Sequence, residues 1–281
     1  MTAKKSGGSR SSNPGRGRGK ARSFVSAERV EDGDRRQYHI GLAPGEVERS
    51  ILLVGDPARA ERVARRMSKV RVEKRHREFV TFTGRIDDLE LSVMATGIGC
   101  DNTEIAVVEL SQIVSSPCFI RAGTCGALQK DMKLEDLVIS TGALRLENTS
   151  TYFVHEGFPA VAHWQVVAAL VAAAEEGRRR HHVGITATAP GFYGAQGRRD
   201  SGFEPRFPDL PDQLARMGVK NLEMETSTLF TLSAMRGFRA GAVCTVFANR
   251  PKNRFIAPDR KIAAEEACLD VAIAALGRLS S

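Results

Sequence analysis

The sequence contains no apolar run of the roughly 20 residues that a membrane-spanning helix needs. Its N-terminal segment has no hydrophobic core of the kind that secretory signals carry. The five cysteines are an odd number and none forms a C-x-x-C pair, which argues against a disulfide framework and against a zinc site. Of its 281 residues, 42% are hydrophobic, which is enough for one substantial core. We therefore expect a reduced, cytoplasmic protein of enzyme size.

Strong charge of one sign is missing from most of the chain. The net charge is +8, but residues 1–36 hold ten Lys or Arg and four Asp or Glu, whereas the remainder holds 31 and 29. Residues 1–36 are also rich in Gly and Ser, and such a segment buries too little surface to offset its ordering entropy. We predict a disordered basic tail over 1–36 and one folded domain over 37–281. A solvated tail is the simplest interpretation, while an RNA-contacting Arg/Gly segment and a transit peptide stay open.

The stretch from Cys118 to Gly126 combines a buried strand with groups that bind anions. It starts apolar, as a buried strand does, and then places Arg121, Gly123 and Thr124 close together. Glycine lets backbone N–H groups approach a ligand closely, and a guanidinium offers a planar fork of donors that matches an oxyanion. These groups suit a small anion such as phosphate at the end of a strand. An ordinary glycine turn after a core strand is the alternative.

A second candidate anion site follows the apolar stretch 51–54. Asp56 is a good N-cap and Pro57 a good first residue for a helix over 58–67. Gly55 then lies at the carboxyl end of a strand and Arg59 in the first helical turn, where free N–H groups and the helix dipole favour an anion. The alternative is an ordinary strand-to-helix connection with Arg59 in solvent.

The order of apolar and amphipathic segments predicts an α/β fold with a mixed sheet. Strands are expected at 51–54, 79–83, 91–95, from 118 onward, and at 137–141, 183–188 and 240–248. Helices are expected at 58–67, 103–114, 163–176, 226–235 and 259–278. Residues 201–215, which contain three prolines, are expected to be irregular and are a candidate lid.

The loop over 191–198 carries groups that suit a planar, hydrogen-bonding ring. Phe192 offers a face for stacking, while Gln196 and Arg198 offer donors and an acceptor for the ring edge. The alternative is a surface turn with Phe192 tucked inward.

The segment Glu223-Met224-Glu225 places two carboxylates directly before a predicted helix. A carboxylate accepts hydrogen bonds from two vicinal hydroxyls at once, which is how proteins commonly hold a ribose. Capping of the helix by Glu225 is the alternative.

Taken together and in order, these segments resemble the nucleoside phosphorylase family, and within it the branch that acts on uridine. The resemblance runs from about Tyr38 to the C-terminus. It rests on the stretches at 39–42, 55–59, 76–79, 96–99, 121–126, 192–198, 223–225 and 249–250. Each stretch is weak alone, and their joint occurrence in this order carries the argument. The fold that it implies is a three-layer α/β fold, with a mixed sheet flanked by helices.

The resemblance also implies a role for each candidate residue. Phosphate would be bound by Gly55, Arg59, Arg121 and Thr124, with Arg77 from a neighbouring subunit. The ribose would be held by Glu223, Met224 and Glu225, with His39 reaching across the same interface. The base would contact Phe192, Gln196, Arg198 and Gly126. The groups expected to act in catalysis are Arg121, Gln196, Arg198 and Glu225. Cys125 is interpreted as a packing residue.

The activity implied is phosphorolysis of uridine to uracil and ribose 1-phosphate, by a pentosyltransferase of nucleoside salvage. Inorganic phosphate is a co-substrate, and no redox cofactor or catalytic metal is expected. The family's monovalent-cation site would lie near Glu78, but the residues 100–102 leave its other ligands open. A homo-oligomer is expected, either a dimer or a hexamer built of dimers. The alternatives are a purine nucleoside phosphorylase and a non-catalytic RNA-binding paralogue that acts through the tail. The resemblance implies that purine-specific relatives carry an acid near the position of Arg250; the segment 247–250 has none, which favours pyrimidines.

Overall fold

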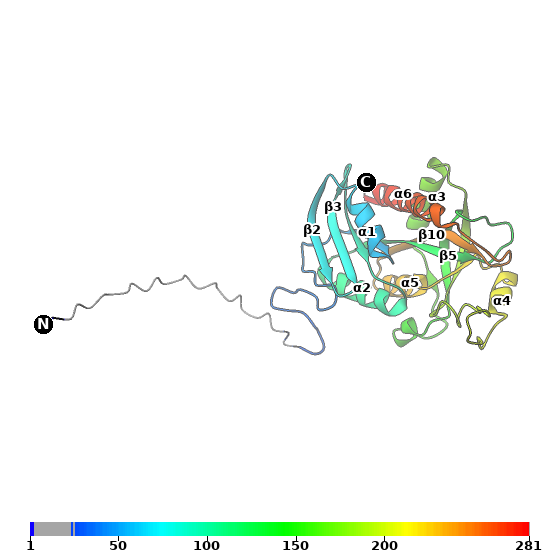
Figure 1. Cartoon of the computed structure of the whole chain (residues 1–281), viewed down its shortest axis with the longest axis horizontal. Coiled ribbons are helices and arrows are strands. Elements are labelled where there is room, and N and C mark those ends of the chain that lie inside the picture. Colours follow the sequence, from blue (N-terminus) through cyan, green and yellow to red (C-terminus); the bar gives the residue numbers. More distant parts are fainter. Residues whose placement is uncertain (3–23, 25, 281) are drawn as a thin grey trace.

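An eleven-stranded mixed sheet organises the protein in the computed structural model, which describes residues 1–2, 24 and 26–280 (Figure 1). The strands are β1 (Ser50–Val54), β2 (Lys69–His76), β3 (Phe79–Ile86), β4 (Leu89–Ala95), β5 (Cys118–Ala127), β6 (Leu137–Arg145), β7 (Ala160–Val161), β8 (His181–Thr188), β9 (Asn221–Glu223), β10 (Arg239–Asn249) and β11 (Arg254–Phe255). The helices are α1 (Pro57–Ala64), α2 (Cys100–Ile113), α3 (Trp164–Glu176), α4 (Leu210–Arg216), α5 (Thr226–Met235) and α6 (Lys261–Ser280), with short 3-10 turns η1 (Thr149–Tyr152) and η2 (Pro258–Arg260).

Four parallel strands form the middle of the sheet, in the spatial order β4, β1, β5 and β10. Beyond β4 the sheet continues antiparallel through β3 and β2. On the other side β10 also pairs with β6, which leads through β8 and β9 back to β5, so these five strands close a ring. Because parallel strands end at the same edge of a sheet, the loops that follow β1, β4, β5 and β10 are brought together.

Helices cover both faces of the sheet and bury two apolar cores. In Figure 1, α1, α3 and α6 lie on one side of β5 and β10, and α2 and α5 lie on the other. Leu52 and Ile120 belong to the core under α1, α3 and α6, whereas Ile51 and Phe119 belong to the core under α2 and α5. Successive residues of a strand point to opposite faces, so a strand buried on both faces is apolar throughout.

The predicted α/β class and three-layer arrangement are confirmed, but several segments differ from the sequence prediction, among them the short strands β7, β9 and β11, which were not predicted. The edge strand β2 was not predicted, because most of its residues are charged and its side chains are mainly exposed, which leaves no apolar alternation to detect. Part of the segment 201–215, which was predicted to be irregular, is the short helix α4. Pro211 lies in the first turn of α4, where the missing N–H of proline costs nothing.

The predicted tail, residues 1–36, lies mostly outside the described residues. In its described part, Arg36 donates two hydrogen bonds to the carboxylate of Glu46, at 2.6 and 2.8 Å. This interaction is the main reason that the pKa of Glu46 is lowered. Asp32 is also buried. Packing onto the folded body therefore begins a few residues before the predicted boundary at 37.

Candidate active site

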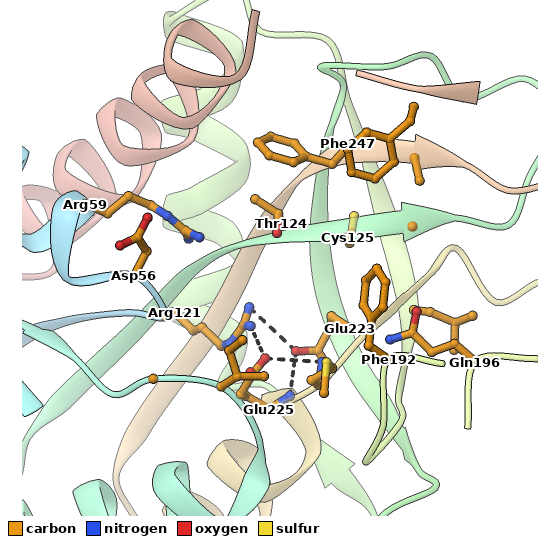
Figure 2. Close-up of a pocket in the computed structure, with 18 of the residues that line it drawn as sticks. Asp56, Arg59, Arg121, Thr124, Cys125, Phe192, Gln196, Glu223, Glu225 and Phe247 are labelled. Carbon is orange, nitrogen blue, oxygen red and sulfur yellow. Dashed lines mark hydrogen bonds and ion pairs between the residues drawn. The ribbon is translucent and has the colours of Figure 1, made fainter. Parts of the chain in front are cut away.

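A cavity of about 560 Å³ lies at the carboxyl ends of β1, β5, β9 and β10 (Figure 2). Most of the residues that the sequence singled out line it: Gly55, Arg59, Arg121, Thr124, Gly126, Phe192, Gln196, Arg198, Glu223, Met224 and Glu225. The two remaining candidates, His39 and Arg77, are not part of the lining. Segments up to about 170 residues apart in the sequence therefore meet around one space.

The turn from β1 into α1 forms one wall of the cavity. Asp56 caps α1, and its carboxylate accepts from the N–H of Ala58 at 2.9 Å, so the predicted N-cap is confirmed. Gly55 lies so close to the loop after β4 that a Cβ would come within 3.3 Å of the carbonyl oxygen of Gly97. This close approach leaves the first turn of α1 facing the cavity.

Arg59 extends from the first turn of α1 along the cavity wall (Figure 2). Its Nη1 donates to the carbonyl oxygen of Ala122 at 3.2 Å, and its Nε lies 3.4 Å from a carboxylate oxygen of Glu265. Its side chain is mostly buried, which contradicts the solvent-exposed alternative. The guanidinium is thus held in place by two contacts within the chain.

The Arg121 side chain runs along the face of β5 over Gly123. A Cβ at position 123 would lie only 2.0 Å from Arg121 Nη1, so this path requires glycine there. The buried guanidinium donates through Nη2 to Glu225 and through Nη1 to Cys244 Sγ at 3.2 Å. Glu223 Oε2 lies 3.6 Å from Nη1. Burial opposes the charge on Arg121, but the attraction of Glu225, Cys244 and Glu223 outweighs it and raises the pKa of Arg121. Arg121 is therefore a permanent cation in the middle of the cavity.

The two carboxylates that precede α5 have different partners (Figure 2). Glu225 accepts from the N–H of Gly99 at 2.7 Å and from Arg121. Glu223 instead accepts from the N–H of Glu225 at 2.9 Å and from that of Thr226. The capping role considered for Glu225 therefore belongs to Glu223. Burial raises the pKa of Glu225, and Arg121 opposes this effect.

The loop after β8 forms the opposite end of the cavity, across from Arg59 in Figure 2. Phe192 is half-exposed, the Arg198 guanidinium lies 3.8 Å from its ring centroid, and the Tyr193 ring packs against it edge to face with the centroids 5.2 Å apart. Arg198 also donates to Gln196 Oε1 at 3.3 Å, and Gln196 is buried. Burial and the nearby charge of Arg250 lower the pKa of Arg198 to about 10, so Arg198 is charged at neutral pH.

Some residues at the site were missed by sequence reasoning. The apolar side chains Phe247 and Phe255, from the β10–β11 hairpin, line the cavity, but nothing in their local sequence indicates it. Cys244 reaches Arg121 only because β10 pairs with β5 in a register that places it opposite Gly123. Cys125 also lines the cavity, where burial and Cys244 raise the pKa of its thiol, as suits a packing residue.

His39 and Arg77 lie elsewhere on the chain. His39 Nδ1 is 2.6 Å from a carboxylate oxygen of Glu109, which also accepts from the backbone N–H of His39 at 3.1 Å. Arg77 follows β2, and its guanidinium lies 4.8 Å from the ring centroid of Tyr38. A single chain therefore does not bring these two residues to the cavity.

The described residues carry neither of two features that would indicate membrane or metal binding. None of the helices there is long and apolar enough to cross a membrane. Nor do the described His, Cys, Asp and Glu side chains form a group of three or more that is arranged to hold a metal ion. Glu78 lies near the loop after β4, because a Cβ built on Gly97 would come 3.9 Å from Glu78 Cγ and 2.8 Å from the amide nitrogen of Asn102.

Comparison with known proteins gives consistent matches over the region that builds the cavity. Residues 49–278 match the model of the phosphorylase superfamily. The chain is 45% identical to a uridine phosphorylase of Thermococcus kodakarensis, over 83% of this chain and 84% of the relative. It is 36% identical to the uridine phosphorylase of Escherichia coli, over 86% of this chain and 97% of the relative. It is also 35% identical to a guanosine phosphorylase of Halorubrum lacusprofundi, over 76% of this chain and 84% of the relative.

Proposed function

This chain belongs to the phosphorylase superfamily, and from that premise we propose that it catalyses the reversible phosphorolysis of uridine to uracil and ribose 1-phosphate. The observation that carries the proposal is the meeting of three groups in one cavity: the cations Arg59 and Arg121, the carboxylate Glu225, and the loop from Phe192 to Arg198. Inorganic phosphate is the co-substrate in this proposal. The reaction needs no redox cofactor or catalytic metal, and we place it in cytoplasmic nucleoside salvage.

Phosphate binds between Arg59 and Arg121 in this scheme, with the Thr124 hydroxyl and the N–H groups at Gly55 as further donors. The ribose lies against Met224, and Glu225 accepts from its 2′- and 3′-hydroxyls. A phosphate oxygen forms a bond to C1′ while the bond from C1′ to N1 of uracil breaks and its electron pair leaves with the base. Because the reaction needs the two partners aligned, fixing both on one rigid frame removes much of the entropic part of the barrier.

The departing uracil carries the negative charge that N1 gains. We assign its stabilisation to Gln196 and Arg198, which donate to the carbonyl oxygens of the base while its face lies on Phe192 and its edge near Gly126. The lowered pKa values of Arg198 and Arg250, both caused mainly by burial, support this role, because burial outweighs the attraction of Asp212 for Arg250 and the charge of Arg250 further lowers the pKa of Arg198. An anionic leaving group is favoured at such a place.

The working site also takes Arg77 and His39 from a second copy of the chain, so we propose a homo-oligomer, either a dimer or a hexamer of dimers.

Arg77→Ala and Arg121→Ala subunits are each expected to be nearly inactive. When the two variants are refolded together, random pairing makes half of the dimers heterodimers. Each heterodimer has one site with both arginines intact, so the mixture should show roughly a quarter of wild-type activity. No recovery on mixing would remove Arg77 from the site.

The decisive experiment is incubation of the protein with uridine, inosine or guanosine, each with and without phosphate, with release of the base measured by chromatography. Uridine phosphorylase activity predicts uracil and ribose 1-phosphate only when phosphate is present. Release without phosphate would mean a hydrolase, and absence of all turnover would overturn the proposal.

Guanosine is the second candidate substrate, because one of the relatives is a guanosine phosphorylase. The end of β10 argues against guanosine. Phe247 and Ala248 line the cavity there and Arg250 follows, so no acid faces the base from this strand. The guanosine arm of the same experiment decides between the two.

A further inference from the structure

Behind the cavity, a set of buried polar side chains links β8 to the first turn of α5. Thr188 is fully buried at the end of β8, directly opposite Glu223 of β9 in the sheet register. Its hydroxyl donates to Glu223 Oε1 at 2.5 Å and accepts from the N–H of Ser227 at 2.9 Å. Thr188 itself does not line the cavity.

Glu223 is enclosed by the protein and hydrogen-bonded to the segment that carries Glu225. Its side chain is 0% exposed. Oε1 accepts from the Thr188 hydroxyl and the Thr226 N–H, and Oε2 accepts from the N–H groups of Glu225 and Thr226. The Thr226 N–H is shared between the two oxygens, so three donors hold the carboxylate: the Thr188 hydroxyl and two backbone N–H groups at the start of α5. Glu223 therefore acts on the backbone that carries Glu225 rather than on the ribose.

Ser227 is held from a second side as well. Its hydroxyl donates to Glu147 Oε1 at 2.8 Å, and the hydroxyl of Ser150 donates to the same oxygen at 2.6 Å. Glu147 is also buried. The first turn of α5 is thus tied to β8 through Thr188 and to the segment after β6 through Glu147.

We propose that Thr188 is a positioning residue, which acts through Glu223 and Ser227 to set the Glu225 carboxylate against the ribose hydroxyls, with Glu147 as its support. The inference rests on the proposed function, because it takes Glu225 as the ribose ligand. A carboxylate that must meet two hydroxyls at once tolerates little displacement, and loss of the Thr188 hydroxyl leaves a Glu223 oxygen and the Ser227 N–H without a partner in a buried place.

The chain offers a matched control two residues earlier. Thr186 lies on the same strand, is equally buried, and is opposite Asn221 in the register. Its hydroxyl donates to Asn221 Oδ1 at 2.7 Å and lies 2.7 Å from Ser140 Oγ, but it has no hydrogen bond to α5. Thr186→Val therefore removes the same group from the same kind of environment without touching the link to Glu225.

The test compares kcat/KM for uridine with that for 2′-deoxyuridine in wild type, Thr188→Val, Thr188→Ser and Thr186→Val. This ratio is internal to each preparation, so it is unaffected by the fraction of folded protein. We expect Thr188→Val to lower the ratio about fivefold to tenfold, because the 2′-hydroxyl contact depends on the position of Glu225. Thr188→Ser, which keeps the hydroxyl, should restore the wild-type ratio, and Thr186→Val should leave it unchanged while lowering stability.

An unchanged ratio in Thr188→Val would overturn the positioning role, as would an equal fall in Thr186→Val. Thr188→Ala carries the same prediction if the valine variant does not yield folded protein. The proposed function is judged separately on the wild type. If the wild type turns over no nucleoside in the presence of phosphate, both proposals are wrong. If the wild type is active but Thr188→Val has an unchanged uridine to 2′-deoxyuridine ratio, only the positioning role is wrong.

Discussion

The two ends of the cavity are built in different ways. At the proposed phosphate and ribose end, Arg121 and Glu225 are 8% and 5% exposed, and their polar atoms already have partners within the chain. At the base end, Phe192 is 44% and Phe255 56% exposed, and the side chains come from a loop and a short hairpin. The first end belongs to the frame of the sheet, whereas the second is attached to it.

In the proposed function, this difference separates the groups that hold phosphate and ribose from the groups that select the base. Groups that stabilise charge in a transition state are most effective when they are already oriented, because no reorganisation is then needed during the reaction. Strand ends and first helical turns provide such orientation. A loop held by fewer contacts can be replaced or reshaped without disturbing the sheet. The identity of the base is therefore expected to depend on the loop over 191–198, which in the proposed function also stabilises the departing base, whereas the orientation of phosphate and ribose is expected to depend on β5 and α5.

The largest expected effect is at the reaction end. Arg121→Ala should lower kcat/KM for uridine by roughly a hundredfold, on the order of 3 kcal/mol, because it removes the cation to which we assign phosphate binding and which pairs with Glu225. Steady-state kinetics, with folding checked by circular dichroism, measures the change. Arg66→Ala is a suitable control, because Arg66 lies just beyond α1 and pairs with Asp270 rather than lining the cavity. Phosphorolysis at an undiminished rate would refute the assignment of Arg121.

Gln196→Ala should have the next largest effect, and it should depend on the base. Gln196 is buried at the loop end of the cavity, and in the proposed function its loss leaves one polar edge of uracil without a partner. We expect kcat/KM for uridine to fall about tenfold to thirtyfold, with a smaller fall for any purine nucleoside that is turned over. A uniform fall for every nucleoside would contradict the separation of the two ends.

The parts that the sequence predicted are those in which one local segment decides the outcome. Asp56 and Pro57 specify the start of α1 on their own, and Glu223-Met224-Glu225 marks the start of α5. The edge strand β2 was missed because its solvated side chains carry no apolar period. The contact of Cys244 with Arg121 depends on the register between β5 and β10, which are more than 100 residues apart, so no local pattern contains it.

Phe192→Ala tests the base end with a milder change. The half-exposed ring offers stacking area, and its loss should raise KM for uridine by roughly fivefold while kcat changes less than about twofold, since stacking is similar in the ground and transition states. Phe192→Leu, which keeps apolar volume without the aromatic face, should fall between alanine and wild type. A large loss in kcat would mean that Phe192 also orders the reaction end.

The smallest and most diagnostic effect is on the pH dependence of uridine binding, measured by calorimetry without phosphate so that phosphate ionisation does not enter. Glu225 must be ionised to accept from two hydroxyls, and burial raises its pKa. As the pH is lowered, uridine affinity should therefore begin to fall at a higher pH than it would if an exposed glutamate were the ligand.

Arg121 opposes the upward shift of the Glu225 pKa, so Arg121→Ala should move the midpoint of this fall in affinity to still higher pH. Arg198, with its pKa of about 10, stays charged throughout the acid range, so its titration does not contribute to the fall of uridine affinity at low pH. Equal midpoints in the two proteins would show that Glu225 does not control ribose binding.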